Sequence, residues 1–184
     1  MVEGGTYKGA TLECVVPADE TAATFAWLRD DAPVDGATGS TYVVVGADVG
    51  HRLACSVTIT HDGVATTETS PPVQIVVLST AIVDRSAAVQ RGPTLTLRGQ
   101  LAADGPTPVG TVSLVVVGKL RSVVVARAQA DAAGGYLLRR TVRALVPGRV
   151  FFRIDFAPAD PELFADPKHV RVVVKAGEVV KQID

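Results

Sequence analysis

Few residues of this 184-residue chain could carry out chemistry, and their spacing argues against a metal centre or a catalytic nucleophile. Zinc sites use clustered cysteine and histidine ligands. Here the cysteines and histidines are scattered, at Cys14, Cys55, His51, His61 and His169. A hydrolase serine typically lies in a Gly-x-Ser-x-Gly turn, and the sequence lacks this motif. The sequence therefore predicts a protein that is not an enzyme, with no catalytic residues, no metal and no cofactor.

Carboxylates are the remaining candidates. Asp30 and Asp31 are adjacent in a segment expected to be a loop, and neighbours in a loop need not face one substrate. The proline-rich stretch 157–168 carries three acidic residues whose oxygens could hold calcium, namely Asp160, Glu162 and Asp166. Because the stretch lacks glycine-spaced ligands, a solvated loop is the favoured interpretation.

The elements that would position these groups are strands. In the first half, apolar residues alternate with polar or small ones in four short segments, which is the period of a β-strand. The inward positions are Leu12, Cys14 and Val16; Phe25 and Trp27; Tyr42 and Val44; and Leu53, Cys55, Val57 and Ile59. Asp62-Gly63 lies between two of the apolar segments and predicts a two-residue hairpin turn. The apolar run 73–78 is expected to be the last strand of this half.

The second half shows the same alternation without any cysteine. Its inward positions are Leu95 and Leu97; Val112, Leu114 and Val116; Val150, Phe152, Ile154 and Phe156; and Val170, Val172 and Val174. With 81–84, 123–128 and 136–142 added, seven strands are expected. A second sandwich, stabilised by apolar burial alone, is the simplest arrangement of these strands.

The first half resembles a known family. The order Cys14, Trp27, Cys55 and the run 42–57, Tyr-Val-Val-Val-Gly-Ala-Asp-Val-Gly-His-Arg-Leu-Ala-Cys-Ser-Val, resemble bacterial immunoglobulin-like repeats. The resemblance implies a β-sandwich whose two cysteine-bearing strands lie in opposite sheets, so that the cysteines meet across the core. It thus implies a Cys14–Cys55 disulfide with Trp27 as the core anchor beside it. Leu53 stands where antibody-type domains have a tyrosine, so no tyrosine-corner hydrogen bond is expected there.

Short turn motifs in the second half, such as 92–99 and 131–136, resemble another bacterial immunoglobulin-like or fibronectin-III-like repeat. The fold prediction is therefore all-β, with two tandem immunoglobulin-like β-sandwiches of about seven strands each. The expected domains are 1–76, with the disulfide, and 77–177, without one. Residues 178–184 are expected to form a C-terminal tail.

The charge is divided unevenly along the chain. Residues 1–76 hold three basic and ten acidic residues, a net −7, whereas residues 77–184 hold fifteen basic and nine acidic, a net +6. Such asymmetry can orient domains or support head-to-tail association of copies, although solvated strand faces explain it more simply. Outward arginines that protect strand edges explain the basic second half better than nucleic-acid binding does. These clustered arginines are Arg139, Arg140, Arg143, Arg149 and Arg153.

No stretch of about 18 apolar residues is present, so no direct membrane insertion is expected. Met1 is the only methionine, and the basic and apolar regions of a signal peptide do not follow it. We therefore expect a piece of a longer protein. Two cysteines suited to a structural disulfide favour a secreted, cell-surface or virion location.

These observations predict a non-enzymatic structural or adhesive module, a spacer or stalk whose partners are other domains of its parent protein. The alternative is a module that recognises a glycan or a host or cell-surface protein, accessory to a larger extracellular enzyme. Loops on a rigid sandwich would then make the contacts. The candidate contact residues are Asp35, Thr38, Asp160, Glu162, Phe164 and Asp166.

Overall fold

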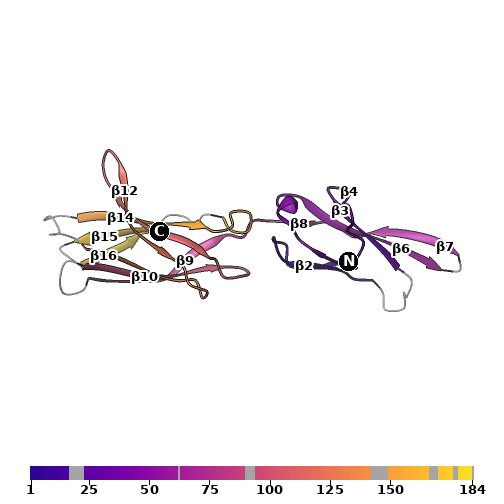
Figure 1. Ribbon diagram of the computed structural model, residues 1–184, viewed down its shortest axis with the longest axis horizontal. Helices are drawn as coiled ribbons and strands as arrows, with labels where there is room; N and C mark the ends of the chain where they lie inside the picture. Colours follow the sequence, from indigo (N-terminus) through magenta and orange to yellow (C-terminus); the bar gives the residue numbers. More distant parts are fainter. Residues whose placement is uncertain are drawn as a thin grey trace. The chain divides into compact units, whose positions relative to one another are not determined.

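The computed structural model describes residues 1–16, 23–61, 63–89, 94–141, 149–165, 170–175 and 178–183. The chain divides into two compact units, unit 1 (Met1–Val77) and unit 2 (Leu78–Asp184), which are described separately (Figure 1). All pairings between the named strands are antiparallel, and the one helical element of the described residues is a 3₁₀ turn, η1 (Gly46–Asp48). No helix in the described part of the chain is long and apolar enough to span a bilayer.

Unit 1 has two sheets. The first has the order β1-β2-β5, with β1 (Val2–Gly4), β2 (Thr11–Cys14) and β5 (Thr41–Val43). The second has the order β4-β3-β6-β7, with β3 (Ala23–Arg29), β4 (Ala32–Pro33), β6 (Arg52–His61) and β7 (Val64–Thr69). A short strand, β8 (Val73–Gln74), pairs with the start of β6. The expected strand 73–78 is therefore limited to its first two residues.

The core of unit 1 contains the predicted disulfide. Cys14 on β2 is bonded to Cys55 on β6, with the two Cα atoms 6.0 Å apart, so the bond joins the two sheets. Trp27 is fully buried, stacks on Tyr42 with ring centroids 5.5 Å apart, and donates from Nε1 to the Gly39 carbonyl at 2.9 Å. The inward residues predicted from alternation all pack in or against this core.

The predicted hairpin between Ile59 and Val64 is also present. His61 pairs with Val64, so that β6 and β7 are joined by a two-residue loop. Gly63 in this loop has φ of +79°, a conformation that glycine adopts at little cost. Asp62, the other loop residue, lies outside the described residues.

Unit 2 also has two sheets. One has the order β13-β10-β9, with β9 (Thr80–Val89), β10 (Thr94–Ala103) and β13 (Gly135–Thr141). The other has the order β12-β11-β14-β15-β16, with β11 (Gly110–Val117), β12 (Ser122–Gln129), β14 (Arg149–Pro158), β15 (Val170–Lys175) and β16 (Glu178–Ile183). The described residues of unit 2 thus form eight strands rather than about seven.

The additional strand corrects the prediction of a C-terminal tail at 178–184. Residues Glu178–Ile183 form β16, which pairs antiparallel with β15. The physical reason lies in the composition of this segment, because Val179, Val180 and Ile183 are β-branched and favour an extended backbone. A hairpin with β15 also satisfies backbone groups that a tail would leave to water.

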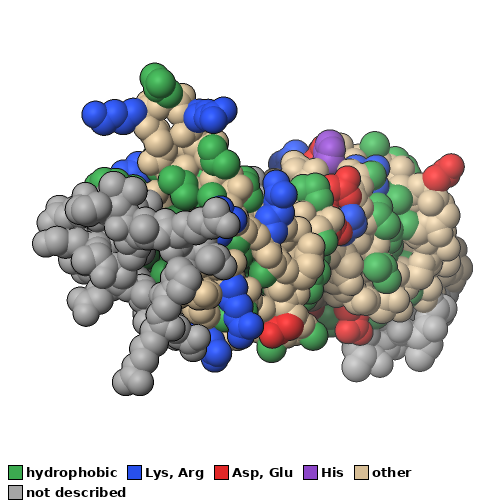
Figure 2. Space-filling model, turned by 60° about the vertical axis from the view of Figure 1, so that its left-hand side comes forward, with side chains coloured by type: hydrophobic (Ala, Val, Ile, Leu, Met, Phe, Trp, Pro, Cys, Tyr) green, Lys and Arg blue, Asp and Glu red, His purple; other side chains and the backbone are tan. Residues whose placement is uncertain are grey.

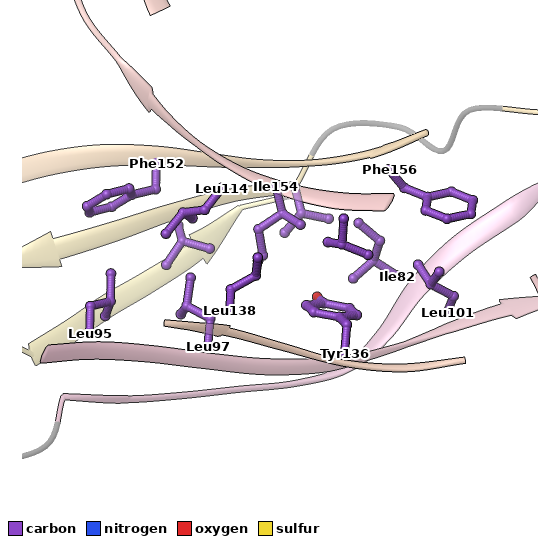
Figure 3. Close-up of a cluster of buried hydrophobic side chains, with 13 residues drawn as sticks. Ile82, Leu95, Leu97, Leu101, Leu114, Tyr136, Leu138, Phe152, Ile154 and Phe156 are labelled. Atoms are coloured by element: carbon purple, nitrogen blue, oxygen red, sulfur yellow. The ribbon is translucent and has the colours of Figure 1, made fainter. Parts of the chain in front are cut away.

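The core of unit 2 lies between its two sheets (Figure 3). Leu95, Leu97 and Leu138 point from the β10 and β13 layer towards Leu114 and Phe152 on the opposite layer. This core contains no disulfide, and its stability comes from packing among buried apolar side chains. Tyr136 is buried with them and is 5% exposed.

The packing around Tyr136 gives a prediction for Gly99, which pairs with it across β10 and β13. A Cβ atom at position 99 would lie 2.5 Å from Cζ of the Tyr136 ring. Gly99→Ala should therefore lower the free energy of unfolding of unit 2 by about 1–3 kcal/mol, as overpacking does in other cores. Circular dichroism in urea measures this change, while the fluorescence of Trp27, the only tryptophan, reports unit 1 and should not change. An unfolding transition of unit 2 that is the same in Gly99→Ala and in the wild type would contradict the prediction.

Candidate functional site

The candidate site of unit 1 is centred on the side chain of Asp48, which lies at the end of η1 and is fully buried. Its Oδ1 accepts from Arg29 Nε at 2.7 Å and Nη2 at 2.5 Å. Its Oδ2 accepts from the Tyr42 hydroxyl at 2.9 Å and from the Val45 backbone N–H at 2.8 Å. Both carboxylate oxygens are therefore used inside the fold.

This network joins the two sheets of unit 1 at a second place besides the disulfide. Arg29 ends β3 in one sheet, and Tyr42 lies on β5 in the other. Hydrogen bonds to Asp48 raise the pKa of Arg29 above its usual value. Burial raises the pKa of Tyr42, and its hydrogen bond to Asp48 adds to the effect. Because Asp48 is inaccessible to solvent, the geometry indicates a structural role and not a reactive one.

The raised pKa of Tyr42 gives a prediction for alkaline pH. The unfolded protein ionises this phenol near its ordinary pKa of 10.0, whereas the folded protein holds the proton to higher pH. The stability provided by the neutral phenol is complete below about pH 10 and is lost as pH rises through the folded-state pKa. Urea unfolding followed by Trp27 fluorescence between about pH 8 and about pH 11 should show a steeper loss for the wild type than for Tyr42→Phe. Parallel curves for the two proteins would contradict it.

A second polar cluster lies on the surface of unit 1, at the turn between β3 and β4. Asp30 Oδ2 is 2.6 Å from His51 Nδ1, and Asp30 Oδ1 accepts from the Arg52 backbone N–H at 2.9 Å. The hydrogen bond to His51 lowers the pKa of Asp30, and the bond from Arg52 acts in the same direction. Asp30 and Asp31 have φ of 45° and 69°, so both are in the left-handed region of a two-residue hairpin loop. Asp30 is thus occupied in holding this turn.

The candidate contact residues of unit 1 lie in one loop. Asp35 and Thr38 are both exposed. The loop is fixed to the core through Trp27, whose backbone N–H donates to the Ala37 carbonyl at 3.0 Å and whose Nε1 donates to Gly39. The backbone of the loop is therefore held by hydrogen bonds to Trp27, while Asp35 and Thr38 remain accessible to solvent.

The candidate residues of unit 2 are brought together only in part. Asp160 is half-buried, and its Oδ1 accepts from the backbone N–H groups of Glu162 at 3.1 Å and Leu163 at 3.2 Å. The side chain of Asp160 thus stabilises its own turn. Glu162 is exposed, and Asp166 lies outside the described residues.

Phe164 requires a correction, because it was expected to be an exposed aromatic contact. It is only 2% exposed and forms an isolated parallel bridge with Leu78 at the start of unit 2. The Leu78 N–H donates to Leu163 at 2.8 Å, and the Ala165 N–H donates back to Leu78 at 2.9 Å. The aromatic ring is buried because this loop packs against the chain segment that enters unit 2, and it cannot stack on a sugar.

The clustered arginines do not form one surface. Arg139 and Arg140 are exposed on β13, whereas Arg153 lies on β14 in the other sheet. Arg153 forms an ion pair with Asp155, with Nε and Oδ1 2.6 Å apart. Arg143 and His169 lie outside the described residues, and among the described ones no group of three or more His, Cys, Asp or Glu is arranged to hold a metal ion.

No protein-family model and no curated protein sequence matches the chain. Among solved structures it is similar to β-glucuronidase 3 of Bacteroides uniformis, with 10% identity and a TM-score of 0.33 over 96% of this chain and 25% of that one. It is also similar to the β-glucuronidase of Parabacteroides merdae, with 9% identity and a TM-score of 0.28 over 96% of this chain and 24% of that one. The chain spans about a quarter of the length of these enzymes, and the low scores assign neither a family nor an activity.

Proposed function

We propose that this chain is a non-enzymatic structural module, a spacer or stalk made of two tandem immunoglobulin-like sandwiches within a larger secreted, cell-surface or virion protein. The observation that carries the proposal is that the cysteines and the buried carboxylate of unit 1 are all engaged in contacts within the fold. Cys14 and Cys55 form the disulfide, and Asp48 is held by Arg29 and Tyr42. These contacts reinforce a scaffold.

The strand orders of the two units support the tandem arrangement. Unit 1 has β1-β2-β5 facing β4-β3-β6-β7, and unit 2 has β9-β10-β13 facing β12-β11-β14-β15, extended by β16. Taken in chain order, β1 to β7 occupy the same places in the sheets of unit 1 as β9 to β15 do in the sheets of unit 2. A cystine between the second strand and the strand after η1 also matches the inter-sheet bond of immunoglobulin domains.

The disulfide supports an extracytoplasmic location, because such bonds persist in oxidising compartments. It also suits a load-bearing role. The 41-residue separation of the cysteines means that most of unit 1 cannot be pulled out while the bond is intact.

Single-molecule stretching of the full chain between terminal handles tests the proposal. Two unfolding events are expected, and the one from unit 1 should release about 140 Å less chain in the oxidised protein than after reduction. The event from unit 2, which has no cysteine, serves as the internal control. Extension of either unit without a resolved unfolding force would argue against a spacer.

The alternative of a recognition module rests on the accessible loop that carries Asp35 and Thr38. A glycan array and a pull-down with cell-surface proteins test it, with Asp35→Ala/Thr38→Ala as the variant. Binding that the variant loses would favour recognition. Binding that persists in the variant would place the contact elsewhere.

A further inference from the structure

The hairpin between β11 and β12 ends in a turn with Lys119 and Leu120 at its apex, and neither residue is of a type that two-residue hairpin turns favour. Val117 pairs with Ser122, and the Gly118 N–H donates to the Arg121 carbonyl at 3.2 Å, which leaves Lys119 and Leu120 at the apex. Two-residue loops favour asparagine, aspartate and glycine at these positions. Here a leucine with 101% relative exposure stands between two cations. The fold does not explain this choice, which points to a binding role.

A bulge sets the direction of the hairpin. Leu114 pairs with Ala126 and Val115 with Val124, so that Val125 has no residue opposite it on β11. Bulges bend a strand and increase its twist. The hairpin accordingly projects from the body of unit 2, and a hydrophobic side chain is visible at the end of the projection between Lys or Arg side chains (Figures 1 and 2).

The flanks of the hairpin add to the apolar surface. Val117, Val123 and Val124 are 41%, 46% and 41% exposed. We refer to these three valines with Lys119, Leu120 and Arg121 as the hairpin tip. Exposed apolar groups beside cations fit a partner that offers an apolar recess edged by negative charge.

Unit 1 contains an apolar recess with a carboxylate at its edge. A cleft of about 480 Å³ opens between the end of β2 and the β6–β7 hairpin, lined by Val15, Val16, Val57 and Ile59 among others. Glu68 and Met1 also line it and are exposed, so its edge carries one carboxylate and the N-terminal ammonium, which donates to the Val15 carbonyl at 3.0 Å. Unit 1 carries a net charge of −7 and unit 2 one of +6, which favours contact between unit 2 of one copy and unit 1 of another.

We propose that the hairpin tip of one copy docks into this cleft in unit 1 of a second copy, with Leu120 in the recess and Lys119 and Arg121 facing Glu68. The two surfaces of such an interface differ, so the contact is heterologous and propagates copies into open chains or rings. This goes beyond the role of a spacer, because it adds self-association through defined surfaces.

Sedimentation of the full chain over a range of concentrations tests the proposal. Leu120→Ser should weaken self-association by about 10- to 100-fold, the cost of no longer burying a leucine. Leu137→Ser, at a residue 37% exposed on β13, is the matched control and should leave it unchanged. Wild-type protein that stays monomeric at low ionic strength, or equal effects of the two variants, would overturn the proposal.

Charge reversal tests the other surface. Glu68→Lys should weaken association, whereas Glu13→Lys, which makes the same change of net charge on β2, should have little effect. Association of the wild type should also fall as salt rises from about 10 mM to about 1 M, over which the Debye length shrinks from about 30 Å to about 3 Å. Equal effects of the two reversals would mean that only net charge matters, which contradicts docking in the cleft.

Mixing two variants gives the sharpest test. Leu120→Ser lacks a working tip but keeps its cleft, and Glu68→Lys lacks a working cleft but keeps its tip. Each variant alone should associate only weakly, and together they should form heterodimers that cannot grow further. A mixture that stays monomeric would overturn the proposal. Binding of monomeric wild type to anionic phosphatidylglycerol vesicles, lost in Leu120→Ser, would replace it with a lipid surface as the occupant.

Discussion

Removing the Cys14–Cys55 disulfide should lower the free energy of unfolding of unit 1 by about 4 kcal/mol. The bond closes a loop with a sequence separation of 41 residues, so without it the unfolded ensemble gains the entropy of an open chain. Trp27 is buried in the same core cluster as the bond, so its fluorescence changes when unit 1 unfolds, and urea unfolding of Cys14→Ala/Cys55→Ala followed by this signal measures the loss.

Reduction of the wild type is the complementary measurement, because it breaks the S–S bond and keeps both cysteine side chains. Both experiments should leave the unfolding of unit 2 in place, since that unit has no cysteine. A loss below about 1 kcal/mol in both would mean that residual structure already constrains the unfolded chain.

Asp48→Ala should lower the free energy of unfolding of unit 1 by about 3 kcal/mol, near the lower end of what breaking a buried ion pair costs. The variant leaves Arg29, Tyr42 and the Val45 N–H without their acceptor. The Arg29 side chain is 30% exposed and recovers some hydration, which keeps the loss from being larger. Urea unfolding by Trp27 fluorescence measures it, and Asp35→Ala, at an exposed carboxylate, is the matched control.

A double-mutant cycle with Arg29→Ala then separates the ion pair from the other contacts of Asp48. We expect a coupling energy of about 1–3 kcal/mol between positions 29 and 48. Additive losses would show that Asp48 acts mainly through Tyr42 and the Val45 backbone.

Much of unit 1 follows from local patterns. Alternation placed Leu12, Cys14, Trp27 and Cys55 inward, and all four are buried. The turn before Val64 follows from Asp62-Gly63, because glycine tolerates the positive φ that the loop needs. These predictions succeed because each depends on neighbours within a few residues in sequence.

Features that depend on distant segments were missed. Asp48 and Arg29 are 19 residues apart and meet only in the folded chain, where Asp48 at the end of η1 accepts a hydrogen bond from Arg29 at the end of β3. The sequence does hold a signal, since Asp48 stands next to Val49 and near Val44 in an otherwise apolar run. Phe164 was misplaced for the same reason, because its partner Leu78 comes from the other end of unit 2.

The Lys119–Leu120 turn has a practical consequence. Neither residue belongs to the buried cluster of unit 2, and the backbone on either side is held by the β11–β12 ladder. Foreign segments are best tolerated at exposed loop tips of this kind. A peptide epitope or a small folded domain inserted between these two residues should therefore be displayed outward while both cores fold as before, which makes the chain a usable presentation scaffold.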